Sequence, residues 1–135
     1  MIAFFDTSIH VDVLRGRLGL DDVVHAVGGG PIRLSPIVAS ELLRGARGGA
    51  IALVEDLIAR LRPIEPSSWR RCWLDAGRLL PKAFRRHEAV GLGRLQNDVL
   101  LALTARQTGT LLLTRDAHFT ALCRYAPFAL KVLDD

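Results

Sequence analysis

The sequence has 135 residues, of which 50% are hydrophobic and 24% charged, and its formal net charge is +4. This length predicts a single domain over residues 1–135, and the composition excludes disorder and low-complexity repeats. No apolar run approaches the roughly 18 residues of a membrane span, and the first residues lack the basic start of a signal peptide. Two cysteines, Cys72 and Cys123, do not form a disulfide framework. We therefore expect a cytoplasmic protein with reduced thiols and no membrane association.

The elements expected along the chain alternate between strand and helix. Short apolar runs predict strands at 2–5, 32–34, 63–65, 110–113 and 130–133. The intervening segments predict helices, which begin at capping residues and often end at glycines: 7–17, 21–27, 36–46, 50–61, a segment from residue 67, 97–108 and 116–125. Pro81 predicts a break that divides the segment from residue 67 into two helices. Alternation of this kind is typical of an α/β fold with a mostly parallel sheet.

The positive charge is concentrated in one segment. Residues 60–94 hold nine basic and three acidic side chains, so this segment carries +6 and the rest of the chain −2. Such a segment could contact a phosphate backbone, although a solvated helix face would have the same composition. The arginines considered for RNA binding are Arg70, Arg71, Arg78, Arg85 and Arg86. Trp69 and Trp73, one helical turn apart, suit core packing or an anchor at a protein interface rather than base stacking.

Four acidic side chains lie near the starts of predicted helices. Asp6 directly follows the first strand, and Asp116 comes shortly after the strand at 110–113. Asp98 opens an apolar helix, and Glu41 lies in the second turn of its helix. Each position has a simpler explanation, because the three aspartates could cap their helices or interact with the helix dipole. Glu41 could form an ion pair with Arg44, three residues later.

Considered together, the four acids favour a different interpretation. Parallel strands bring their carboxyl ends to one edge of a sheet, where ligands bind in α/β proteins. Carboxylates that share a pocket repel one another unless a cation is bound between them. Oxygen ligands suit Mg²⁺ or Mn²⁺, and such ions bind phosphate oxygens and activate water for attack on a phosphodiester.

Four segments resemble the PIN-domain family, and in particular the small toxin ribonucleases of VapBC toxin–antitoxin modules. They occur in the family's order and together span almost the whole chain: Phe5-Asp6-Thr7-Ser8 with Leu14-Arg15-Gly16, Ser40-Glu41-Leu42-Leu43-Arg44-Gly45, Asn97-Asp98 through Ala105, and Leu113-Thr114-Arg115-Asp116-Ala117-His118-Phe119. The resemblance implies a three-layer α/β/α fold around a short, mostly parallel sheet of four to five strands.

The resemblance also implies a site. Its acidic metal pocket for Mg²⁺ or Mn²⁺ would consist of Asp6, Glu41, Asp98 and Asp116. Thr7, Ser8 and Thr114 would be hydroxyls that orient carboxylates or water. Many relatives have a further acid where His118 stands here, and we expect His118 to be an ordinary, partly exposed helix residue. The family further implies a homodimer and a small antitoxin whose basic side chain enters the pocket.

These observations predict a metal-dependent endoribonuclease, the toxin of a type II toxin–antitoxin module, which hydrolyses RNA through a metal-activated water. Glu41 or Asp116 would position or deprotonate that water, and the sequence does not rank them. The alternative is a catalytically inactive PIN-like module that binds RNA or protein. A phosphoaspartyl phosphatase is disfavoured because Asp6-Thr7-Ser8 lacks a second acid two positions after Asp6.

Overall fold

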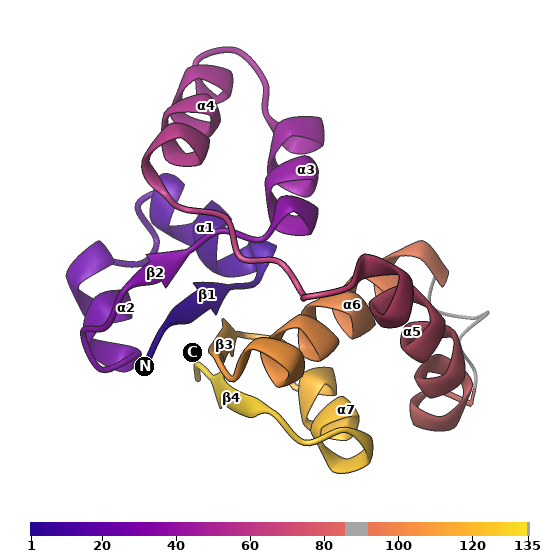
Figure 1. Ribbon diagram of the computed structural model, residues 1–135. Coiled ribbons are helices and arrows are strands. Elements are labelled where there is room, and N and C mark those ends of the chain that lie inside the picture. Colours follow the sequence, from indigo (N-terminus) through magenta and orange to yellow (C-terminus); the bar gives the residue numbers. More distant parts are fainter. Residues whose placement is uncertain (86–91, 135) are drawn as a thin grey trace.

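A sheet of four parallel strands forms the centre of the molecule (Figure 1). The computed structural model describes residues 1–85 and 92–134. The spatial order of the strands is β2-β1-β3-β4, with bounds β1 Ala3–Phe5, β2 Ile32–Arg33, β3 Leu111–Thr114 and β4 Ala129–Val132. The expected α/β class with a short parallel sheet is confirmed. The segment expected as a strand at 63–65 makes one isolated bridge, Pro63 to Leu34, so the prediction of a strand there is wrong; the bridge consists of the hydrogen bonds from Leu34 N to Arg62 O and from Ile64 N to Leu34 O.

Helices cover both faces of the sheet. Their bounds are α1 Thr7–Leu14, α2 Leu20–Ala26, α3 Pro36–Gly45, α4 Ala50–Arg60, α5 Trp69–Ala83, α6 Leu92–Thr108 and α7 His118–Tyr125. Phe5 and Leu113 pack with apolar residues of α1 and α2, whereas Phe4 and Leu112 pack with those of α3 to α7. This alternation along each strand produces the three layers. In the described part of the chain, no helix is long and apolar enough to cross a membrane.

Helix α6 begins five residues before the predicted start. Leu95 and Val99, one turn apart, are both buried, so the apolar face of the helix extends to the N-terminal side of Asn97. Asp98 therefore lies inside the helix, and its interpretation as a capping residue is wrong. A carboxylate within a helix that is otherwise buried needs another explanation, because removing its charge from water is costly without a partner.

Helix α5 continues through Pro81, so the prediction of two helices is wrong. Pro81 stands in the last turn, where its missing N–H removes one backbone hydrogen bond near a helix end. Phe84 N still donates to Leu80 O at 3.0 Å and closes the helix beyond the proline.

Candidate active site

A small cleft of about 140 Å³ opens at the carboxyl ends of β1 and β3. Asp6 enters it from the end of β1, Asp116 from the segment after β3, Glu41 from α3 and Asp98 from α6. The structure thus brings together all four acidic residues singled out in the sequence. The other residues that line the cleft are Thr7, Ser8 and Arg94.

Asp6 is held at the base of this cleft by backbone and side-chain donors. Thr7 N donates to Asp6 Oδ1 at 2.8 Å, and Thr114 Oγ1 donates to Asp6 Oδ2 at 2.9 Å. Asp6 therefore caps α1 as well as facing the cleft. Burial raises the pKa of Asp6 to about 6, and the negative charges of Asp98 and Glu41 contribute, while the two hydrogen bonds oppose the shift. Among the described residues, no basic side chain forms an ion pair with Asp6 to stabilise its ionised form.

The two threonines tie the acids to each other. Thr7 Oγ1 donates to Glu41 Oε1 at 3.0 Å, which links α1 to α3. Thr114 Oγ1 accepts from Asp116 N at 3.0 Å while it donates to Asp6.

Within the described residues Glu41 makes no ion pair with Arg44, so the pairing considered from their spacing does not form. Ser8 is exposed at the rim of the cleft.

Two basic side chains that sequence reasoning did not place in the site contact its acids. Arg94 Nη2 lies 3.1 Å from Asp116 Oδ2. His118 is partly exposed, as expected, but its ring bridges two acids: Nε2 lies 2.6 Å from Asp98 Oδ2 and Nδ1 lies 2.6 Å from Asp116 Oδ1. Burial lowers the pKa of His118, but the carboxylates of Asp98 and Asp116 outweigh burial and raise it overall. The signal available in the sequence was spacing: Arg94 lies one helical turn before Asp98.

The donor set of the cleft fits a divalent cation by its chemistry. Carboxylate oxygens are what Mg²⁺ and Mn²⁺ prefer, and Asp6, Glu41, Asp98 and Asp116 supply them. Across the described residues, however, no three His, Cys, Asp or Glu side chains are already arranged as metal ligands. Asp98 and Asp116 are instead turned to His118 and Arg94. Binding of an ion would therefore exchange these internal cations for the metal.

Comparison with known proteins identifies the family. The model of the PIN domain matches residues 3–125. The chain belongs to the PIN domain family. A comparison with curated protein sequences gives no match.

Several solved structures share the fold of this PIN domain. VapBC2 from Rickettsia felis, bound to a DNA fragment from its promoter, gives a TM-score of 0.69 at 22% identity over 99% of this chain and 100% of the other. VapBC-1 from nontypeable Haemophilus influenzae gives 0.68 at 19% identity over 98% of both chains. FitAcB from Neisseria gonorrhoeae gives 0.61 at 22% identity over 96% of both chains.

The basic surface expected on this PIN domain lies outside the acidic cleft. Arg70, Arg71 and Arg78 are exposed on α5, and Arg85 is exposed just after it, whereas Arg86 lies outside the described residues. Arg71 and Arg78 pair with Asp75 at 3.7 and 2.9 Å. Trp69 is partly buried against the core, but Trp73 is 48% exposed, so core packing accounts for the first tryptophan only.

Both cysteines, Cys72 and Cys123, are free thiols, as expected from the sequence.

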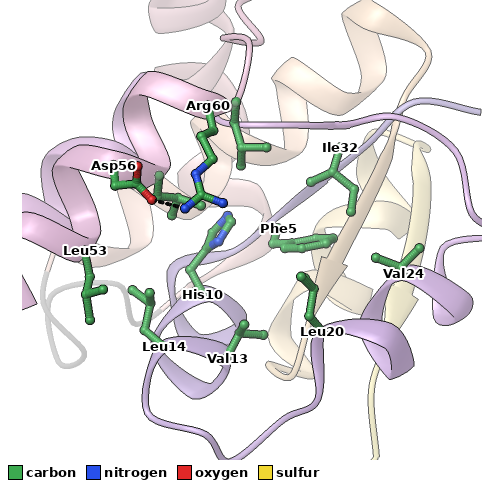
Figure 2. Close-up of a pocket in the computed structure, with 12 residues that line it drawn as sticks. Phe5, His10, Val13, Leu14, Leu20, Val24, Ile32, Leu53, Asp56 and Arg60 are labelled. Atoms are coloured by element: carbon green, nitrogen blue, oxygen red, sulfur yellow. Dashed lines mark hydrogen bonds and ion pairs between the residues drawn. The ribbon is translucent and has the colours of Figure 1, made fainter.

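A second cavity of about 390 Å³ lies among α1, α2 and α4 and is mostly apolar (Figure 2). Its lining includes Phe5, Leu20 and Leu53, and the ring of His10 faces it between Phe5 and Arg60. His10 is buried, and its Nε2 has no hydrogen-bond partner in the described part of the protein. Burial lowers the pKa of His10 to about 4, so the ring is neutral near pH 7. Arg60 and Asp56 form an ion pair at the edge of this cavity.

We expect Asp6→Asn to raise the melting temperature above pH 6 when chelator keeps metal away. The pKa of Asp6 rises from 3.8 to about 6 on folding, so its ionised form destabilises the folded state. This penalty is absent at low pH, grows as the pH rises through the interval between the two pKa values, and then stays constant. The full shift corresponds to about 3 kcal/mol at most. Thermal unfolding of both proteins at acidic and alkaline pH measures it.

Asp12→Asn is the matched control, because Asp12 is equally buried on α1 but is paired. Its carboxylate lies 3.5 Å from Arg17 and 3.2 Å from Arg115, so its loss should lower the melting temperature. The account of Asp6 fails if Asp6→Asn gives the same change in melting temperature at pH 4 and pH 8.

Proposed function

We propose that this protein is a metal-dependent endoribonuclease that acts as the toxin of a type II toxin–antitoxin pair. The observation that carries the proposal is the convergence of Asp6, Glu41, Asp98 and Asp116 on one cleft of a PIN domain. Four carboxylates with incompletely balanced charge suit a site that must attract a divalent cation before it can accept a phosphate. Membership of the PIN family and the fold shared with VapBC chains support nuclease activity and an antitoxin partner.

Asp6, Asp98 and Asp116 would hold Mg²⁺ or Mn²⁺, with Glu41 as a further ligand directly or through water. When bound, the ion would lower the pKa of a water molecule and shield the charge of the scissile phosphate. Thr7 and Thr114 fix the orientation of Glu41 and Asp6 through their hydroxyl donors. Positioning of this kind avoids reorganisation of the carboxylates during the reaction.

The contacts favour Glu41 over Asp116 as the group that takes a proton from the attacking water. Both oxygens of Asp116 are engaged, Oδ1 by His118 and Oδ2 by Arg94. Glu41 uses Oε1 to accept from Thr7, and in the described residues its Oε2 has no partner, so this oxygen is available to a water in the cleft. A base must lie within hydrogen-bond reach of the proton that it accepts, and Glu41 is the better placed of the two.

In a cleavage assay on mixed RNA with Mg²⁺ or Mn²⁺, we expect Asp6→Asn and Asp98→Asn to abolish activity. Each substitution removes a negative charge that would hold the metal, and folding is checked by circular dichroism. Glu41→Gln should lower kcat by about 100-fold or more, because general-base catalysis contributes on that scale. Asp22→Asn is the control, since this exposed carboxylate lies on α2, outside the cleft. Wild-type activity in the aspartate variants, or activity that survives chelator, would contradict the proposal.

One observation favours the second candidate, a PIN-fold module that binds RNA or protein without cutting. Asp98 and Asp116 already have internal partners in His118 and Arg94, so part of the acidic charge is balanced without metal. This candidate predicts RNA binding but no cleavage by the wild-type protein at any concentration of Mg²⁺ or Mn²⁺. The same assay therefore separates the two functions.

We further propose that an apolar segment of the antitoxin occupies the cavity among α1, α2 and α4. Leu20 and Leu53 are 57% and 52% exposed at this cavity, and exposed leucines that share a cavity are typical of a docking site. His10 Nε2 offers the segment one unused hydrogen-bonding group within the apolar lining.

The cytoplasmic location of the protein stays a prediction, and so does the homodimer that the family resemblance implies.

We expect Leu53→Asp to weaken binding of the cognate antitoxin, encoded beside the toxin gene, by about 100-fold or more. An unpaired charge would then lie in an apolar interface, which costs several kcal/mol. Leu74→Asp is the matched control, because Leu74 is similarly exposed but lies on α5, away from this cavity. Calorimetric titration measures both, and equal affinities for the two variants would place the antitoxin elsewhere.

A further inference from the structure

Three adjoining hollows form a groove that leads from the acidic cleft to the exposed tryptophan of α5. The cleft shares Glu41 and Arg94 with a neighbouring cavity of about 500 Å³. That cavity shares Arg44 and Asn97 with a third one of about 410 Å³, whose wall includes Trp73. The three hollows therefore form one path between α3 on one side and α5 and α6 on the other.

Three polar side chains along this path have no partner among the described residues. In the described residues the side chain of Arg44 makes no ion pair and no hydrogen bond, although it is exposed at the end of α3 and lines two of the three cavities. The amide of Asn97 and the indole N–H of Trp73 are likewise unpartnered within the described ranges. By contrast, Trp69 Nε1 donates to Glu65 Oε1 at 3.2 Å, so this tryptophan is fixed in the wall.

We propose that this groove binds single-stranded RNA next to the scissile phosphate, with a base stacked on Trp73 and a phosphate paired with Arg44. The inference rests on the proposed function and names the path of its substrate. Every nucleobase has a face that can stack on an indole ring, and an unpaired arginine is the side chain best suited to a phosphate oxygen. Asn97, between the two, can donate to or accept from the edge of a base.

The charge of the groove favours RNA over a second protein chain as its occupant. Arg44 and Arg94 stand on the path itself, and Arg70 and Arg71 are exposed on the same helix as Trp73. The acids of the path lie at its end, where the metal would neutralise them. A strand that enters the cleft must leave it along some surface, and this groove is continuous with the cleft.

The test measures the affinity of a labelled, single-stranded oligoribonucleotide by fluorescence anisotropy, in an Asp98→Asn background that removes cleavage. Trp73→Ala should weaken binding by about tenfold, because loss of one stacking platform has an effect of this order. Trp73→Phe should retain most of the affinity, since phenylalanine also stacks. Arg44→Gln should weaken binding and reduce the slope of log Kd against log salt by about one, the value expected for one lost phosphate contact.

Two controls distinguish RNA binding at Trp73 from a contact between copies of the chain at the same face. Leu74→Ala removes the neighbouring exposed side chain on α5, which does not line the groove, and should leave the affinity unchanged. Light scattering gives the mass of each variant. The inference is overturned if Trp73→Ala binds RNA as the parent protein does, or if it converts a dimer to a monomer, which would make this face a contact between copies. If the wild-type chain neither binds nor cuts RNA, the proposed function itself fails.

Discussion

The repulsion among carboxylates at one edge of a parallel sheet is the constraint on which the rest of the site depends. Asp6 follows β1 and Asp116 follows β3, and these strands are neighbours in register, with Phe5 opposite Leu113. The topology therefore forces the two acids together, and α3 and α6 add Glu41 and Asp98. Burial raises the pKa of Asp6, and the negative charges of Asp98 and Glu41 raise it further, because both effects disfavour its ionised form.

Every polar contact around the cleft relieves or orders this charge. The threonines at 7 and 114 supply hydroxyl donors that fix Glu41 and Asp6. His118 bridges Asp98 and Asp116, and Arg94 takes the second oxygen of Asp116. These partners let the domain fold with Asp6 and Asp98 buried, yet within the described residues Asp6 and one oxygen of Glu41 have no cationic partner. Under the proposed function, this residual charge is what a divalent ion neutralises.

The sequence was sufficient to predict the four strands of the sheet, the fold class and the acids that meet in the cleft, although the strand expected at 63–65 forms only an isolated bridge. Each of these depends on local patterns: apolar runs, capping residues, and the rule that parallel strands end at one edge. The helix boundaries around Pro81 and Asn97 were wrong because packing outweighed local signals. Buried Leu95 extends α6 past its apparent cap, and α5 tolerates a proline in its last turn.

The basic partners of the acids could not be predicted in the same way. Arg94 lay in a segment rich in arginine and before the predicted start of its helix, so its one-turn spacing from Asp98 did not by itself separate it from the exposed arginines of α5. His118 stood where relatives often have an acid, but its bridging role depends on the distance between two elements that are far apart in sequence. The groove toward Trp73 also depends on tertiary packing, since α3, α5 and α6 each contribute part of its wall.

The central claim is that this cleft binds a divalent cation in place of its internal basic partners. Calorimetric titration of Mn²⁺ into chelator-treated protein above pH 6 tests it most directly, with Asp6→Asn and Asp98→Asn as comparisons. The account predicts saturable binding to the wild-type protein that is lost in both variants. Absence of binding at millimolar Mn²⁺, or binding that both variants retain, would contradict it.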